Sequence, residues 1–217
     1  MRALRNLGIF LGVLIVVAVV ADVGTRYLVE NRIESTIEGA DTVVDVGNVD
    51  AHVDSFPFLG RLATQGRIDH FSLRLEDLAY DGGRFDALEL DVAGVVFERS
   101  RLFNAQVEVQ SLERATISAE ITEATATEAV GVPVTLTPGT ATVVVGGQSR
   151  SAAVAVGDGV LTLSTDGLGV LTIPIAENDY FPCAVDARVE QGRFVLSCTA
   201  TELPPALRQV VGGGGIN

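Results

Sequence analysis

The sequence predicts an α+β fold in which one helix precedes an antiparallel β-sheet. Apolar side chains recur every four residues at Val29, Ile33 and Ile37, which is the spacing of one helix face. From residue 71 onwards, many segments instead alternate apolar and polar residues, as half-buried strands do. Turn residues such as Asp81-Gly82-Gly83 separate the earlier strands, so the pattern favours hairpins over an alternating βαβ chain.

A basic and apolar leader occupies residues 1–21. Arg2 and Arg5 precede an apolar or Gly run from Leu7 to Ala21, which is 21 − 7 + 1 = 15 residues long. A helix of that length spans about 22 Å. The run is short for a membrane span but suits a secretory signal. It is therefore either a signal peptide cleaved after Ala21 or an uncleaved signal anchor. Both alternatives place the rest of the chain outside the cytoplasmic membrane, because the arginines stay inside.

A helix is expected over residues 22–38, with Gly39 as its stop. Strands are expected at 71–76, 88–92, 107–109 and 117–121, then a short helix at 122–130, then strands at 143–145, 152–156, 161–163 and 171–175. Small apolar residues on both faces of 152–156 indicate tight curvature or burial on both sides. A brief helix is expected from Pro204 to Arg208. No break in composition marks a second domain, so 22–210 is predicted to be one domain and 211–217 a flexible Gly-rich tail.

Two cysteines bracket a predicted hairpin. Apolar residues alternate along both arms of the hairpin between Cys183 and Cys198. The apolar residues are odd-numbered on the first arm and even-numbered on the second, so two apolar residues that face each other across the hairpin have numbers that sum to an odd value. A four-residue loop at Val189–Gly192 gives the sum 183 + 198 = 381, which sets the cysteines opposite each other. A tight turn at Gln191–Gly192 would offset them diagonally, which strains a disulfide. We therefore expect the wider loop and a disulfide bond. The alternative is two buried free thiols.

Composition excludes several function classes. The chain has 15 Lys+Arg, all of them Arg, against 28 Asp+Glu, a net charge of −13, so nucleic acid is excluded as a main partner. The only histidines are His52 and His70, and no HxH, HExxH, GxSxG or P-loop motif occurs. Asp69 cannot orient His70, because adjacent strand residues face opposite ways. The sequence therefore predicts a protein that is not an enzyme and uses no cofactor or metal. A hydrolase would require His52 or His70 to meet an acidic partner and a nucleophile in one cleft.

The segment SFPFLG at residues 55–60 is unusual in a chain with 6% aromatic residues. Pro57 fixes the backbone there, so Phe56, Phe58 and Leu59 project from a short loop. Such a loop lines the mouth of an apolar groove, dips into a lipid interface, or plugs one end of the core.

This layout resembles the LmeA-like phospholipid-binding family of actinobacterial cell envelopes. The residues that carry the resemblance are the leader with its helix, SFPFLGRLATQG, the strands RIDHFSLRLEDL and FDALELDV, the TEATATEAV helix, and VPVTLTPGTATVVV with GVLTL beyond it. FPFL and Gly66 are the most specific of these, and the cysteine pair has no counterpart in the pattern. The resemblance implies a secreted or membrane-anchored domain that is similar to tubular lipid-binding domains, in which a curved antiparallel sheet wraps around a long helix.

The function expected from this resemblance is a cell-envelope phospholipid-binding protein that holds or shuttles lipid in an apolar groove. It would work at the outer face of the cytoplasmic membrane, support envelope lipid or glycolipid synthesis, and meet the enzymes of that synthesis as partners. The alternative is an anchored, non-enzymatic scaffold for an envelope enzyme, with a closed core. The candidate lipid-binding residues are the rim residues and the inward positions of two strands: Phe56, Phe58, Leu59, Phe71, Leu73, Leu75, Leu88, Leu90 and Val92.

Overall fold

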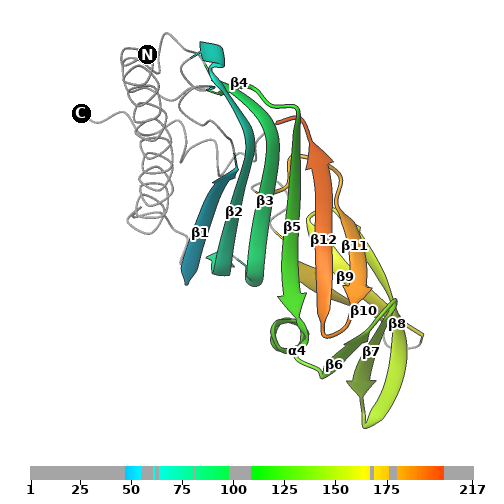
Figure 1. The fold of residues 1–217 in the computed structure, drawn as a ribbon. Helices are drawn as coiled ribbons and strands as arrows, with labels where there is room; N and C mark the ends of the chain where they lie inside the picture. The colour runs from blue at the N-terminus through cyan, green and yellow to red at the C-terminus, as the bar shows by residue number, and fades with distance from the viewer. Residues whose placement is uncertain are drawn as a thin grey trace, which may run out of the picture.

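A computed structural model describes residues 47–54, 61, 64–80, 82–97, 109–166, 169–175 and 180–202. Within them the chain forms two antiparallel sheets and one short helix (Figure 1). The long sheet has the order β1-β2-β3-β5-β12-β11, with β4 beside β3, and the small sheet has the order β10-β9-β8-β7-β6. The expected helices at 22–38 and 204–208, the wrapping of the sheet around a helix, and the tail lie outside the described residues.

The long sheet is built from β1 (Asn48–Asp54), β2 (Arg67–Tyr80), β3 (Gly83–Phe97), β4 (Val109–Ser111), β5 (Arg114–Thr122), β11 (Asp186–Glu190) and β12 (Arg193–Ala200). The strands predicted at 71–76, 88–92 and 117–121 are confirmed as parts of β2, β3 and β5. Tyr80 pairs with Gly83, so the turn predicted at Asp81-Gly82-Gly83 joins β2 to β3. Val107 lies outside the described residues, and Val109 opens β4.

The small sheet consists of β6 (Val134–Thr137), β7 (Thr140–Val145), β8 (Gln148–Gly157), β9 (Val160–Thr165) and β10 (Gly169–Pro174). β8 changes partner halfway along its length: Gln148–Ala152 pairs with β7, and Ala153–Gly157 pairs with β9. Within 152–156 only Ala152 is buried, while Ala153 and Ala155 are exposed. Burial on both sides, one of the two alternatives from the sequence, is therefore wrong.

The predicted helix at 122–130 is confirmed as α4 (Glu123–Val130). Thr122 caps its start by accepting a hydrogen bond from the Thr125 N–H, and Gly131 ends it in the left-handed conformation, with φ 72°. α4 is short and buries only Ala126, so tertiary contacts rather than helix propensity hold it. It lies where the long sheet meets the small one, in contact with β3, β5, β6 and β10 (Figure 1).

One continuous core serves both sheets. Large fully buried side chains come from the long sheet, such as Phe85 and Phe194, and from the small sheet, such as Leu161 and Leu163. β11 contacts β6, β7 and β8, and Gly139 donates its N–H to Val189 O at 2.9 Å. Tyr80, Phe85, Tyr180 and Phe181 form an aromatic cluster in which neighbouring ring centroids lie 4.7–6.2 Å apart.

The disulfide between Cys183 and Cys198 is confirmed, with Cα atoms 5.9 Å apart, but the predicted hairpin loop is wrong. Glu190 pairs with Arg193, a sum of 190 + 193 = 383, so Gln191 and Gly192 alone form the turn. β11 begins only at Asp186, so Cys183 is not held in the ladder and reaches Cys198 from the segment before the strand. Pro182 has no N–H to donate to a ladder, which fits this late start.

Candidate functional site

The inner face of the long sheet carries the predicted strand residues of the lipid-binding surface. Phe71 pairs with Val92, Leu73 with Leu90, and Leu75 with Leu88, so the six side chains lie in three adjacent rows. Five of them are buried, with 1–5% of their surface exposed, and Phe71 is half-buried. The alternation of inward and outward residues therefore predicted correctly that all six lie on one face of two neighbouring strands.

The same apolar surface continues onto the strands on either side. β1 adds Val49, Ala51 and Val53, which pair with Leu75, Leu73 and Phe71. β5 adds Ala115, Ile117 and Ala119, which pair with Val92, Leu90 and Leu88. All six added side chains are buried, and all are aliphatic. We call this combined surface the aliphatic face; it offers hydrocarbon contacts over four strands and no hydrogen-bonding side chain.

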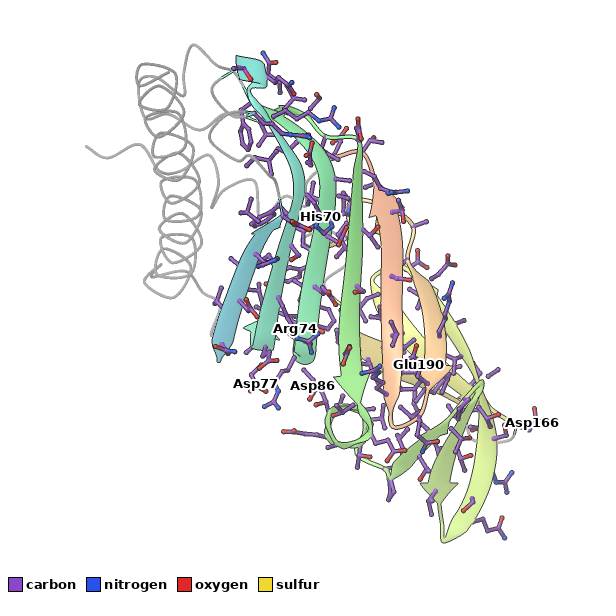
Figure 2. All side chains as sticks on the ribbon, viewed as in Figure 1. His70, Arg74, Asp77, Asp86, Asp166 and Glu190 are labelled. Carbon is purple, nitrogen blue, oxygen red and sulfur yellow. A yellow bond between two sulfur atoms is a disulfide. The ribbon has the colours of Figure 1, made fainter. Side chains whose placement is uncertain are left out.

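The outer face of the same strands is charged. Arg74 lies 3.3 Å from Glu76 and 3.7 Å from Glu89, and His70 Nε2 lies 2.8 Å from Asp91 Oδ2 (Figure 2 labels His70 and Arg74). Arg193 joins Glu190 at 2.9 Å and Glu120 at 3.1 Å. The hydrogen bond to Glu190, followed by the charge of Glu120, raises the pKa of Arg193. The sheet thus separates an apolar side from an ion-paired side.

Two open cavities, each of about 500 Å³, lie at opposite parts of the described structure. The first, at the ends of β3, β5 and β12, is lined by Ala93, Glu113, Arg114, Thr199, Ala200 and Thr201. The second, between β11 and β8, is lined by Gly139, Ala152, Ala153, Val154, Ala187, Arg188 and Val189. Each cavity therefore combines small side chains with one arginine.

A sequence profile described as LmeA-like phospholipid-binding matches residues 20–211, a span of 211 − 20 + 1 = 192 residues. The chain belongs to the LmeA-like phospholipid-binding family. Comparisons with the curated proteins and with the solved structures found no match. The matched span includes the aliphatic face and the residues that line both cavities.

Three predicted members of the site, Phe56, Phe58 and Leu59, lie outside the described residues. Among the residues that the structure describes, no helix is long and apolar enough to cross a membrane. The expectations about the leader and about the FPFL loop therefore stay predictions.

In this LmeA-like family member, His70 lies on the charged outer face of the long sheet. The acidic partner of His70 is Asp91 on β3. Its sequence neighbour Asp69 binds Arg61 instead. The His70 and Asp91 side chains are 39% and 46% exposed, and neither lines a cavity described above. In the part of the chain that the structure describes, no group of three His, Cys, Asp or Glu residues is placed to hold a metal ion.

Sequence reasoning missed the polar residues of the first cavity. Arg114 opens β5, whereas Thr199 and Thr201 lie at the end of β12, more than 80 residues later. β5 and β12 are neighbours in the sheet, with Thr116 opposite Thr199 and Ala115 opposite Ala200. No local pattern signals this pairing, because it is made between strands that the whole small sheet separates in sequence.

Proposed function

We propose that this chain is a carrier that holds or shuttles phospholipid by its acyl chains along the aliphatic face. The proposal places it in the cell envelope, at the outer face of the cytoplasmic membrane, as one lipid-binding domain over residues 22–210. There it supplies lipid for envelope lipid or glycolipid synthesis and meets the enzymes of that synthesis. Membership of the LmeA-like family and the outward-facing charges of the same strands support this proposal.

The single observation that carries the proposal is the uninterrupted hydrocarbon character of the inner face across four adjacent strands. One whole row across the sheet holds only hydrocarbon side chains, from Val53 on β1 through Phe71 and Val92 to Ala115 on β5. A surface of this kind recognises hydrocarbon, and each buried CH₂ of a lipid contributes about 0.8 kcal/mol. A lipid held in this way needs no charged anchor for its tails.

The charge distribution argues against docking on anionic membranes through a basic patch. The chain carries a net charge of −13, and the arginines of the outer face are largely paired with acids. Polybasic recognition of anionic headgroups needs clustered free cations. We therefore expect lipid binding to weaken only mildly as the salt concentration rises.

One observation favours the second candidate function, a non-enzymatic scaffold for an envelope enzyme. Leu73, Leu88 and Leu90 are 4%, 2% and 3% exposed, which is the burial expected of a closed core. In a scaffold these side chains would stay buried against the rest of the protein. In a carrier, bound lipid would replace the protein groups that bury them. The two functions therefore differ in whether lipid is taken up.

The test is native mass spectrometry with lipid extraction on the full chain produced in a bacterial host. We expect phospholipid to co-purify at a defined stoichiometry and Phe58→Asp to reduce it without unfolding the protein. Val170→Asp is the matched control, because Val170 is 60% exposed on β10 and lies away from the aliphatic face. A lipid-free protein that also takes up no phospholipid from vesicles would favour the scaffold.

A further inference from the structure

Arg114 is an unpaired cation in an acidic protein. Arg61, Arg67, Arg74, Arg84 and Arg193 each lie within 4 Å of a carboxylate, and Arg150 donates to the Asp166 carbonyl and to Gln148. Within the described part of the chain, Arg114 and Arg188 have no ion pair or side-chain hydrogen bond. These two are also the arginines that line the two cavities.

Arg114 shares its cavity with two hydroxyl groups. Ala93 lies opposite Arg114 on β3, and its methyl group leaves room beside the guanidinium. Thr199 and Thr201 line the other side of the cavity, and neither hydroxyl has a hydrogen-bond partner among the residues described. A guanidinium with its planar array of donors, joined by two hydroxyl donors, matches the oxygens of a phosphate group.

Two carboxylates near Arg114 in the sheet are already bound by other side chains. Glu113, which also lines the cavity, accepts a hydrogen bond from Arg67 at 2.9 Å. Asp91, which lies opposite Thr116 on β5, is bound to His70 at 2.8 Å. The Arg114 charge is therefore left available to an external anion.

The cavity adjoins the row of the sheet in which the aliphatic face ends. Ala200, one of its lining residues, pairs with Ala115, and Ala115 pairs with Val92 in the row that Phe71 and Val53 complete. The cavity thus brings Ala200, which lies beside the last inner row of the sheet, together with the outward side chains of Arg114 and Thr199. A molecule with hydrocarbon on the inner side and a phosphate at the rim fits this arrangement.

We infer that Arg114, with the hydroxyls of Thr199 and Thr201, binds the phosphate of the phospholipid whose chains lie along the aliphatic face. This inference rests on the proposed lipid-carrier function. It names the residues that would bind the headgroup of the carried phospholipid. The second cavity offers Arg188 only alanine, valine and glycine neighbours, so it lacks the additional donors that a phosphate needs. Inorganic phosphate shares the chemistry of the headgroup, and the experiment separates the two sources.

The experiment compares Arg114→Gln with the matched control Arg188→Gln in the full chain. Both changes remove one exposed, unpaired arginine that lines a cavity. The probes are a fluorescent phosphatidylglycerol, a diacylglycerol with the same labelled chain, and inorganic phosphate. We expect Arg114→Gln to weaken phosphatidylglycerol binding about tenfold, the loss of a charged hydrogen bond, and to leave diacylglycerol binding unchanged. Arg188→Gln should bind both lipids like the wild type.

Thr201→Val is the second variant, because it keeps the side-chain shape and removes the hydroxyl. We expect it to weaken phosphatidylglycerol binding in the same direction, by a smaller factor. Equal affinity of Arg114→Gln and wild type for phosphatidylglycerol would overturn the inference while leaving the carrier function intact. So would an equal loss in Arg188→Gln, or phosphate binding that depends on Arg114 and is not competed by phosphatidylglycerol. A wild-type protein that binds neither lipid would instead overturn the carrier function.

Discussion

The Asp86 carboxylate accepts the backbone N–H of Thr122 at 2.8 Å, and this bond joins the start of β3 to the residue that caps α4. The same carboxylate accepts the hydroxyls of Thr122 at 3.1 Å and of Thr125 at 2.9 Å. Its side chain is 19% exposed, so these bonds form in a partly desolvated place. Glu123, the first helical residue, accepts the Leu136 N–H of β6. Asp86 therefore organises the junction between the two sheets.

Replacing Asp86 should destabilise this junction. We expect Asp86→Ala to lower the free energy of unfolding by about 2 kcal/mol, because it leaves a backbone donor and two hydroxyls without their acceptor. Urea unfolding followed by circular dichroism measures the change. Asp91→Ala is the control: its pair with His70 is exposed, so it should cost less than about 1 kcal/mol. Equal losses in the two variants would contradict a special role for Asp86.

Removing the disulfide should lower stability without changing the fold. Cys183 and Cys198 are 15 residues apart, and closing a loop of that size contributes about 3 kcal/mol on the chain-entropy model. We expect Cys183→Ser/Cys198→Ser to lower the free energy of unfolding by that amount, measured by urea unfolding. Dithiothreitol should lower the stability of the wild type to the level of the double variant and leave the variant unchanged. A wild type that is insensitive to the reductant under unfolding conditions would argue against the bond.

Tyr80 should make stability fall at high pH. Burial, and to a lesser extent the neighbouring Tyr180, raises the pKa of Tyr80 above its ordinary value of 10. The folded state then holds the phenol proton more tightly than the unfolded chain, so this contribution is complete below pH 10 and decreases as the pH rises further. Urea unfolding at pH 8 and pH 11 measures the decrease.

The matched variant for this effect is Tyr80→Phe, which has no proton to lose. At neutral pH it should be less stable by about 1 kcal/mol, because Tyr80 donates a 2.7 Å hydrogen bond to the Pro174 carbonyl. Between pH 8 and pH 11 it should lose less stability than the wild type does. The same loss in both proteins would show that Tyr80 titrates normally.

Shortening a side chain on the aliphatic face should affect stability far more than changing its outward neighbour. Leu90 is 3% exposed, so Leu90→Ala should cost about 2–4 kcal/mol. Glu89, on the opposite face of the same strand, is exposed, and Glu89→Ala should cost less than about 1 kcal/mol. Thermal unfolding of both variants tests this, and comparable costs would mean that the inner face of the sheet is not its packed side.

Local patterns predicted the strands of this protein well, because the alternation of inward and outward side chains is a property of each strand alone. The alternation predicted which residues of β2 and β3 face inward. The helix α4 was predicted from the TEATATEAV segment between two strands. The partner of His70 did not follow, because Asp91 belongs to another strand. The division into two sheets was also not predicted, since β5 pairs with β12 and all strands of the small sheet lie between these two in the sequence.

The wrong hairpin loop has a specific cause. The expected loop depends on Cys183 lying in a strand, where a disulfide requires Cys198 directly opposite it. In the structure Cys183 precedes β11 and is free of the ladder, so a tight turn at Gln191 and Gly192 is compatible with the bond. Gly192 has φ 77°, a conformation that glycine adopts without strain, which favours the tight turn.

The change of pairing partner along β8 also determines how the small sheet unfolds locally. Because Gln148–Ala152 belongs to one hairpin and Ala153–Gly157 to the next, neither hairpin can open without disturbing the backbone of the other. Amide hydrogens of β7 and β9 should therefore exchange with solvent in the same opening event, with similar protection. The small sheet then behaves as one cooperative unit, although its strands are individually short.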